Sequence, residues 1–171
     1  GTWTWQTRST DPGLDGASGS FEVVPSGRAG SLRPMASHPY HFERQDGSRF
    51  WFLGETAWSL YVDSDEEQHD RAAAFHHIDV RAEQGFNVFH SMLLSELGWI
   101  NHGGAPFDDL QAETINPAYW QEVDQRLAYL NKKGIIGGLV LAWGRKQWDA
   151  SEPFAWDRFP DLAAKQRYAR Y

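Results

Sequence analysis

The spacing of apolar and polar residues changes along the chain, from a period of two near the N-terminus to a helical period further on. Residues 1–25 hold two short alternating segments separated by the turn-forming sequence DPGLDGASG, and this pattern predicts a hairpin. Because two strands alone are marginally stable in water, we interpret residues 1–25 as the C-terminal strands of a β-sandwich domain. Residues 26–37 are small, polar and rich in glycine and proline, which is typical of a linker.

A second hairpin is predicted where YHFERQ and SRFWFL flank Asp46 and Gly47, a pair that favours a two-residue type I′ turn. That turn would place Phe42 opposite Trp51 and create one face of large apolar pairs. The apolar run 50–53 is expected to enter a core as the first strand of the following domain.

Helical spacing begins after this strand. Ser64, with Glu67 three residues later, forms a capping-box signal for a helix start, and Gly85 is placed to end that helix. A second helix is predicted to start at Asn116, which precedes a proline. Apolar strands follow these two helices, as FNVFHSMLL and IIGGLVLAW, and a further helix is expected over residues 160–171.

Strands and helices therefore alternate, which predicts a parallel sheet covered by helices. Both a doubly wound sheet and a (β/α)₈ barrel fit this order. The turn after the first strand, GETAWSLYVDS, lacks the glycine-rich phosphate loop of dinucleotide-binding sheets. The strand-to-helix loops are long and the helix-to-strand returns are short, which favours a barrel with its site at the carboxyl ends of the strands.

Polar or aromatic residues lie at the end of each predicted strand, and the ends of parallel strands converge on one crevice. These candidate substrate-binding residues are Glu55, Thr56, Trp58, His90, Glu96 and Trp143. One such end could equally be a local cap or part of the core, but three in succession favour a site. His90 is compatible either with a core histidine or with a side chain that points into the mouth of a barrel.

The composition narrows the classes of partner. The net charge of −7, with 23 acidic and 16 basic residues, argues against nucleic acid, and no segment reaches the length of a membrane helix. Nine tryptophans fit either a tryptophan-rich core or flat surfaces for sugar rings. The absence of cysteine excludes thiolate metal sites, and His69, His76 and His77 lack zinc-site spacing. We therefore expect no metal and no cofactor.

Three segments, HFERQDGSRFWFLGETAWSLY, RAEQGFNVFHSMLLSEL and NPAYWQEVDQRLAYLNKKGIIGGLVLAWG, resemble the start of the apiosidase-like glycoside hydrolase domain. The family pattern is a hairpin leading to Leu-Gly-Asp/Glu-Thr-Ala-Trp, then Gly-Phe-Asn-Val, then a helix and a strand ending in Trp-Gly. The three motifs occur in the family's order, and the resemblance covers residues 38–171. Residues 1–25 likewise resemble the last strands of the small β-sandwich that often precedes this domain.

The resemblance implies a glycoside hydrolase that cleaves plant-type polysaccharides or oligosaccharides, in a secreted or periplasmic protein whose targeting segment would precede Gly1. It implies an α/β fold in which residues 38–171 supply the first three βα units of an incomplete (β/α)₈ TIM barrel. In the family the acid/base and the nucleophile come from the fourth and later strands. No catalytic residue is therefore expected in this chain, and the chain alone is expected to be inactive.

The resemblance also assigns roles to some of the candidate residues. Glu55 corresponds to a sugar-binding position, and Trp58 and Trp143 correspond to walls of the substrate crevice. An incomplete sheet leaves an open edge, so we expect the isolated chain to self-associate. Two other hypotheses are a non-catalytic carbohydrate-binding or matrix-binding protein and an unrelated doubly wound enzyme.

Overall fold

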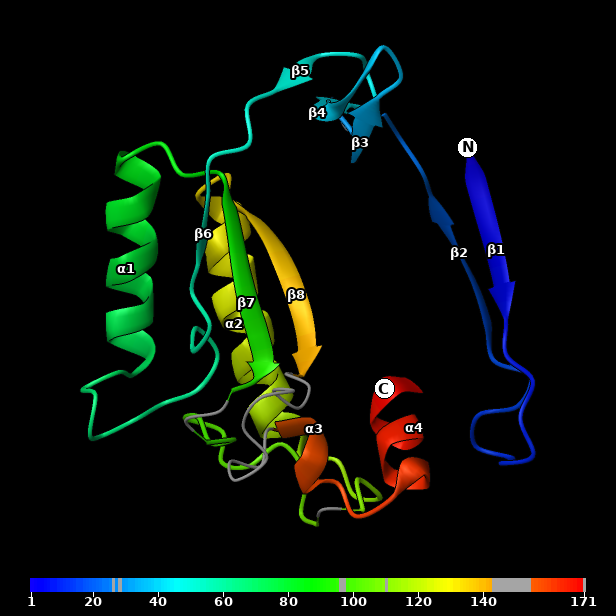
Figure 1. The fold of residues 1–171 in the computed structure, drawn as a ribbon. Helices are drawn as coiled ribbons and strands as arrows, with labels where there is room; N and C mark the ends of the chain where they lie inside the picture. Colours follow the sequence, from blue (N-terminus) through cyan, green and yellow to red (C-terminus); the bar gives the residue numbers. More distant parts are fainter. Residues whose placement is uncertain (26, 28, 96–97, 110, 143–154, 171) are drawn as a thin grey trace. The chain divides into compact units, whose positions relative to one another are not determined.

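The structure is a computed structural model that describes the chain except for residues 26, 28, 96–97, 110, 143–154 and 171 (Figure 1). The chain forms two compact units, Gly1–Trp51 and Phe52–Tyr171, and each is described by itself. The sequence analysis placed the start of the second domain at residue 38, whereas the second hairpin belongs to the first unit in the structure.

The predicted N-terminal hairpin is present. Strands β1 (Thr2–Gln6) and β2 (Ser18–Glu22) are antiparallel, with Trp3 opposite Phe21. The two strands form a sheet of their own, without a third strand in the described part of the unit. Their assignment to a β-sandwich remains a prediction.

The segment expected to be a linker contains a strand, so the linker interpretation was wrong for residues 32–35. Strand β3 (Leu32–Met35) pairs with β4 (His38–Arg44), which pairs in turn with β5 (Arg49–Phe50). The expected linker composition did not reveal the strand because it holds only two apolar side chains besides its proline.

The predicted register of the second hairpin was wrong by one residue. Phe42 lies opposite Phe50 rather than opposite Trp51. The loop contains three residues and not two, because the amide of Arg44 donates to the carbonyl of Ser48 at 2.8 Å. Gly47 has a φ of +86° there, the left-handed residue that three-residue hairpin loops require.

The run 50–53 is not one buried strand, contrary to the prediction. Strand β5 ends at Phe50, and Trp51 is 79% exposed. The next strand, β6 (Gly54–Thr56), begins after three intervening residues and belongs to the second unit. The aromatic residues of this run therefore connect two sheets instead of entering one core.

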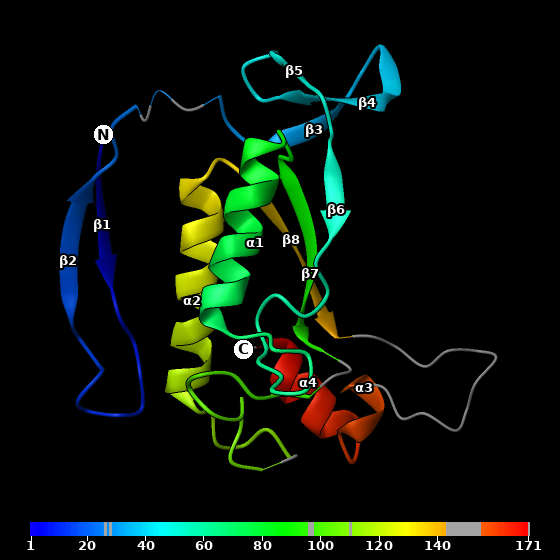
Figure 2. The same ribbon diagram turned by 90° about the vertical axis from the view of Figure 1, so that its left-hand side faces the viewer.

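The second unit confirms the predicted parallel sheet. Strand β6 pairs with β7 (Val88–Leu94), and β7 pairs with β8 (Ile136–Ala142), in the order β6-β7-β8. Helix α1 (Arg71–Glu83) connects β6 to β7, and α2 (Pro117–Lys132) connects β7 to β8. Figures 1 and 2 show both helices on the same face of this sheet.

The first helix starts later than the capping-box signal predicted. The carboxylate of Asp70 accepts from the amide of Ala73 at 2.8 Å and caps α1. Ser64 does accept from the amide of Glu67 at 3.2 Å, but this bond closes a turn before the helix. The predicted end of the helix near Gly85 is confirmed.

The predicted start of the second helix is also confirmed. The side chain of Asn116 accepts from the amide of Ala118 at 3.1 Å and caps α2, with Pro117 as its first residue. Two short helices, α3 (Ala155–Arg158) and α4 (Leu162–Arg170), follow the sheet. No helix among the described residues is long and apolar enough to cross a membrane.

The core of the second unit lies between the sheet and the two helices. Ile78 of α1, Phe89 of β7 and Leu130 of α2 are fully buried there. A second part of the core is aromatic, and it joins α4 to the loop before α2. The ring of Tyr168 stacks on Phe159 with centroids 5.4 Å apart, so several aromatic residues serve packing and not ligand binding.

Candidate active site

One face of the parallel sheet is covered by the helices, and Glu55 lies on it. Glu55 is in register with Phe89 of β7 and Gly137 of β8. The ring of Phe89 lies 5.6 Å from that of His77 on α1. A Cβ atom added to Gly137 would lie 2.7 Å from Cδ1 of Leu127 on α2. Glu55 therefore points toward the helices.

The carboxylate of Glu55 is bound by α1. Its Oε1 contacts Nε2 of His77, and its Oε2 forms an ion pair with Nε of Arg81. Thr56, the next residue in the strand, points to the opposite face, because successive strand residues alternate. The sequence analysis expected Glu55 in one crevice with Thr56 and His90. In the structure Glu55 instead lies on the opposite face of the sheet from them.

Thr56 and His90 lie side by side on the face that α1 and α2 leave uncovered. They are paired in the parallel register of β6 and β7. His90 is exposed among the described residues. The ring of Trp58 lies 6.0 Å from that of His90, with 30° between the ring planes. These three predicted site residues are thus brought together where β6 ends beside β7.

The backbone on either side of Trp58 is fixed to strand β7. The amide of Ala57 donates to the carbonyl of His90 at 2.8 Å, and the amide of Met92 donates to the carbonyl of Trp58 at 3.1 Å. The hydroxyls of Ser59 and Ser95 are 3.3 Å apart. The segment that carries Trp58 therefore follows β7 closely past the end of β6.

An open hollow of about 590 Å³ lies between this segment and α1. Thr56 and Trp58 line it together with three histidines, His69, His76 and His77. The sequence analysis considered these histidines as metal ligands and did not predict that they line a hollow with Trp58. Helical spacing could have indicated this, since positions 76 and 77 share a helix face with positions 73, 80 and 81. No group of three or more His, Asp or Glu residues in the described ranges could hold a metal ion.

A buried charged residue on α2 was also missed. Glu122 accepts from Nε of Arg71 at 2.9 Å and from Nε of Arg126 at 2.8 Å. Burial alone would raise the pKa of Glu122, but the hydrogen bonds from Arg71 and Arg126 outweigh it and hold the pKa below its usual value. Burial raises the pKa of the nearby Tyr61 to about 12. Both side chains therefore keep their ordinary charge states at neutral pH.

Two predicted site residues, Glu96 and Trp143, lie outside the described residues. Their assignment to the site stays a prediction. The described part of the candidate site consists of Thr56, Trp58 and His90, with the histidine-lined hollow beside them.

Comparison with known proteins agrees with this arrangement of strands and loops. The model of the family described as "Apiosidase-like, catalytic domain" matches residues 37–171. The chain belongs to this family. The prediction from the three sequence motifs is confirmed, and its expected start at residue 38 differs from the match by one residue. Comparison with curated proteins gives no match.

Solved structures with a similar fold are glycoside hydrolases by name. One comes from Bacteroides vulgatus ATCC 8482 and is provisionally named a glycoside hydrolase. It is 24% identical, with a TM-score of 0.63, and the similarity covers 82% of this chain and 30% of the chain of that structure. Another, named "Glycoside hydrolase", is 24% identical with a TM-score of 0.53, over 66% and 25%. A family 5 glycoside hydrolase from the same Bacteroides strain is 21% identical with a TM-score of 0.54, over 66% and 24%. The chain thus spans 30% or less of these structures, and they bear on the fold alone.

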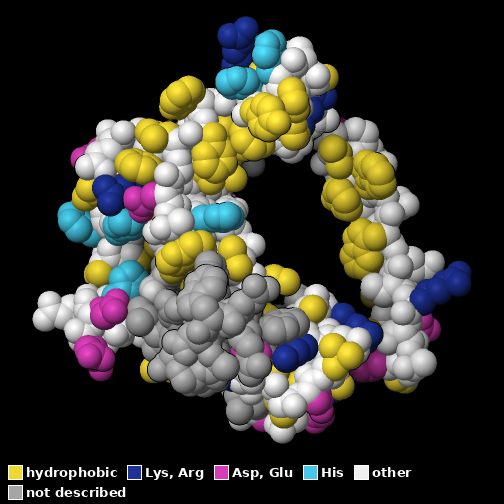
Figure 3. Space-filling view, in the orientation of Figure 1, with side chains coloured by type: hydrophobic (Ala, Val, Ile, Leu, Met, Phe, Trp, Pro, Cys, Tyr) yellow, Lys and Arg dark blue, Asp and Glu magenta, His cyan; other side chains and the backbone are white. Residues whose placement is uncertain are grey.

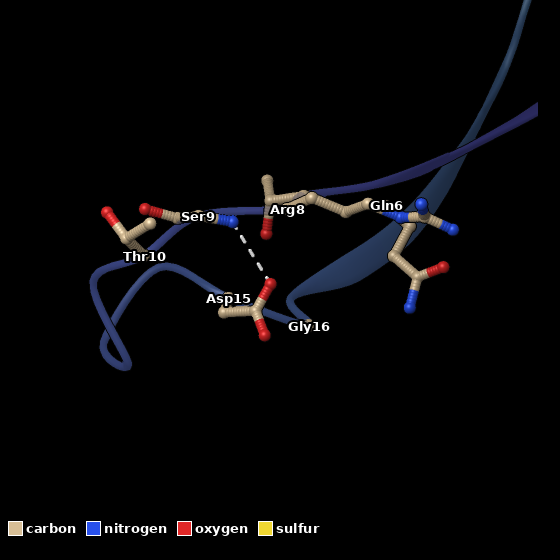
Figure 4. A pocket seen from close by; sticks show the side chains of 7 residues that line it. Gln6, Arg8, Ser9, Thr10, Asp15 and Gly16 are labelled. Atoms are coloured by element: carbon tan, nitrogen blue, oxygen red, sulfur yellow. Dashed lines mark hydrogen bonds between the residues drawn. The ribbon is translucent and has the colours of Figure 1, made fainter.

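The other compact unit contains a hollow that is distinct from this site. It lies in the loop that joins β1 to β2, and its volume is about 550 Å³ (Figure 4). The carboxylate of Asp15 accepts from the amide of Ser9 at 3.0 Å across it. The amides of Asp11 and Gly13 are likewise bound by side chains of the same loop. These bonds stabilise the turn, which is sufficient to explain the polar side chains there.

Hydrophobic side chains also gather on the hairpin of the first unit. Figure 3 shows them as a row along β1 and β2. Trp3, Trp5 and Phe21 belong to this row, and Trp3 is 62% exposed. The apiosidase-like match begins after these residues, so the row lies outside the family's domain.

Proposed function

We propose that this chain forms the first three βα units of a (β/α)₈ glycoside hydrolase barrel. The consecutive strand order β6-β7-β8 supports this fold. Both connecting helices lie on one face of the sheet, as in a barrel, whereas a doubly wound sheet places helices on both faces. The proposed reaction is cleavage of glycosidic bonds in plant-type polysaccharides or oligosaccharides, outside the cytoplasm.

Thr56, Trp58 and His90 are the proposed start of the saccharide-binding wall. The observation that carries this assignment is the pairing of the Trp58 and His90 rings, 6.0 Å apart, on the face of the sheet that α1 and α2 leave uncovered. Trp58 follows the carboxyl end of β6, and the carboxyl ends of the strands are where barrel enzymes bind substrate. The flat indole suits the apolar face of a sugar ring, and the threonine hydroxyl and the imidazole can bond to sugar hydroxyls. Glu96 and Trp143 extend the proposed wall along the next loops.

The catalytic carboxylates are proposed to come from later strands of the barrel. Glycoside hydrolysis ordinarily requires two carboxyl groups, an acid and a base or nucleophile. Across β6, β7 and β8 the only acidic residue is Glu55, and His77 and Arg81 bind it on the helix-covered face. The described strands therefore place no carboxylate beside Trp58 and His90. The chain alone is expected to bind saccharide without hydrolysing it.

A hydrolysis assay of the chain on a panel of plant oligosaccharides tests this proposal. We expect no release of reducing ends by the chain and ready release by the longer protein that contains all eight strands. Release by the chain itself, lost in the Trp58→Ala variant, would contradict the assignment of the carboxylates to later strands. The variant distinguishes such activity from that of a contaminating enzyme.

A non-catalytic carbohydrate-binding protein is the second candidate function. The same exposed face favours it, because the described strands place a tryptophan and a histidine there, which can bind sugar, but no carboxylate that could act as the acid. The two candidates differ in the eight-stranded protein. Binding without cleavage by that protein would establish the second candidate and refute the first.

A further inference from the structure

The segment that follows Trp58 is held by buried side chains of the next βα unit. Its three consecutive carbonyl groups, those of residues 60–62, all accept from such side chains. The carbonyl of Leu60 accepts from Nη1 of Arg126 at 2.9 Å, and that of Tyr61 accepts from Nδ2 of Asn101 at 3.1 Å. The carbonyl of Val62 is 3.4 Å from the same Nη1. A loop rarely has every carbonyl of such a run bound by buried side chains, so this one is fixed in position.

Arg126 is the centre of this arrangement. Its side chain is fully buried on α2, and its remaining nitrogen atoms bind two carboxylates. Nε donates to Glu122 at 2.8 Å, and Nη2 forms an ion pair with Asp63. The planar guanidinium donates in three fixed directions at once, which a lysine ammonium on its flexible stem cannot reproduce.

The contacts continue from this segment to the candidate site without a break. One residue separates Trp58 from Leu60, and the amide of Leu60 donates back to the carbonyl of Ala57 at 3.2 Å. The carbonyl of Trp58 is itself bound by the amide of Met92. A displacement of Leu60 must therefore move the backbone that directs the Trp58 indole toward His90.

We propose that Arg126 is a positioning residue for the saccharide site, because it fixes the segment 60–63 and so sets the angle of the Trp58 ring beside His90. Arg126 itself is buried and touches no substrate. The link to saccharide binding rests on the function proposed above. The effect on the Trp58 ring does not, and it can be measured without a ligand.

Fluorine NMR of the chain labelled with 5-fluorotryptophan measures this effect, with the Trp58 resonance assigned by its loss in Trp58→Phe. The test variants are Arg126→Lys and the milder Asp63→Asn, which folds even if Arg126→Lys does not, since Asp63 is partly exposed. Both are expected to shift or broaden the Trp58 resonance. Both should also speed amide exchange at residues 60, 62 and 63 about tenfold, the effect of losing one charged hydrogen bond.

Asp79→Asn is the matched control. Asp79 of α1 accepts from the hydroxyl of Tyr129 on α2 at 2.9 Å and pairs with Lys133 at 2.6 Å. It therefore links the same two helices as the Arg126 network, but at the end remote from segment 60–63. The variant should lower stability and leave the Trp58 resonance unchanged. An equal change in Asp79→Asn and Asp63→Asn, or no change in Asp63→Asn, would overturn the proposal.

A titration of the labelled chain with plant oligosaccharides separates this inference from the proposed function. If sugar shifts the Trp58 resonance of the wild type, and the same shift in Asp63→Asn requires about tenfold more sugar, both the proposed function and the positioning role are supported. If the Trp58 resonance of the wild type does not change when sugar is added, the proposed function is contradicted. The comparison of the variants without ligand still decides whether Arg126 positions the ring. Saccharide affinity that is equal in the two proteins contradicts the positioning role.

Discussion

The two compact units contain similar aromatic residues but use them in different ways. In Gly1–Trp51 the large side chains are exposed, and Tyr40 reaches 95%. In Phe52–Tyr171 the residues Phe159 and Tyr168 are buried against one another. The difference follows from layering. The second unit has helices over its sheet, whereas neither small sheet of the first unit is covered by a helix in the described residues.

This comparison shows that aromatic content alone predicts neither packing nor binding. A tryptophan contributes to stability only where a second layer covers it, since the burial of apolar area is what stabilises. Trp58 belongs to neither extreme, because it is half-buried beside an exposed histidine. A partly covered aromatic ring at a strand end is the better candidate for ligand binding than either a buried or a fully exposed one.

The largest expected loss of stability comes from breaking the buried ion pairs of the second unit. Glu122→Gln leaves Arg71 and Arg126 without their shared carboxylate, and removal of one partner of a buried ion pair costs about 3–5 kcal/mol. The matched change in the first unit, Glu43→Gln, breaks only the exposed pair with Arg33 and should cost about 1 kcal/mol or less. Urea unfolding of both variants checks the difference, and equal costs would contradict it.

The same carboxylate gives a pH dependence. The pKa of Glu122 is lower in the folded protein than its ordinary value of 4.5. Its contribution to stability is therefore complete above pH 4.5 and is lost as the pH falls through the lowered folded value. The unfolding free energy of the wild type should thus fall with acid below that pH more steeply than that of Glu122→Gln. Parallel profiles of unfolding free energy against pH for the two proteins would contradict the contribution of the Glu122 carboxylate to stability.

A core truncation is expected to have the next largest effect. Leu130→Ala removes a fully buried side chain between α2 and the sheet, and such changes cost about 2–5 kcal/mol. Tyr40→Ala in the first unit should change stability by about 0.5 kcal/mol or less, because this side chain is exposed. Thermal unfolding of the two variants compares them. A costly Tyr40→Ala would mean that the first unit is covered in solution.

Tyr119→Phe tests one buried hydrogen bond. The hydroxyl of Tyr119 donates to the carbonyl of Leu93 at 2.7 Å and joins α2 to the end of β7. Its loss leaves that carbonyl unpaired, at a cost of about 1–3 kcal/mol. Amide exchange should increase in β7 and α2 but not in β3–β5. Equal exchange changes in both units would contradict their description as separate bodies.

A turn glycine tests the first unit by itself. Gly47 has a φ of +86°, which a residue with a Cβ adopts at a cost of about 1–2 kcal/mol. Gly47→Ala should speed amide exchange in β4 and β5 and leave the second unit unchanged. Gly13→Ala, at a glycine without positive φ, is the control and should have a smaller effect.

Much of the second unit could be predicted because its signals are local. Asn116 caps the second helix, Gly85 ends the first, and the apolar strands alternate with helices as their pattern indicates. The errors arose where two local signals competed. Ser64 and Asp70 both offer a cap, but the chain between them is not helical, because Gln68 has a φ of +51° and Ser64 pairs with His69.

The candidate site could be predicted in part. Thr56, Trp58 and His90 converge because the parallel register pairs the last residue of β6 with His90 of β7 and the chain then follows β7 to Trp58. Glu55 does not join them, since the alternation of a strand sends it to the opposite face, where α1 supplies its partners. The role of Arg126 could not be predicted, because its acceptors lie more than sixty residues away in the sequence.

Saccharide binding by matched tryptophan variants tests the central claim most directly. Calorimetric titration with plant oligosaccharides would compare the wild type with Trp58→Ala and with Trp3→Ala, an exposed tryptophan outside the apiosidase-like domain. The proposed site predicts binding that weakens about tenfold or more in Trp58→Ala, which corresponds to roughly 1.4 kcal/mol, and that is unchanged in Trp3→Ala. Equal affinity in Trp58→Ala and the wild type would contradict the proposed site at Thr56, Trp58 and His90.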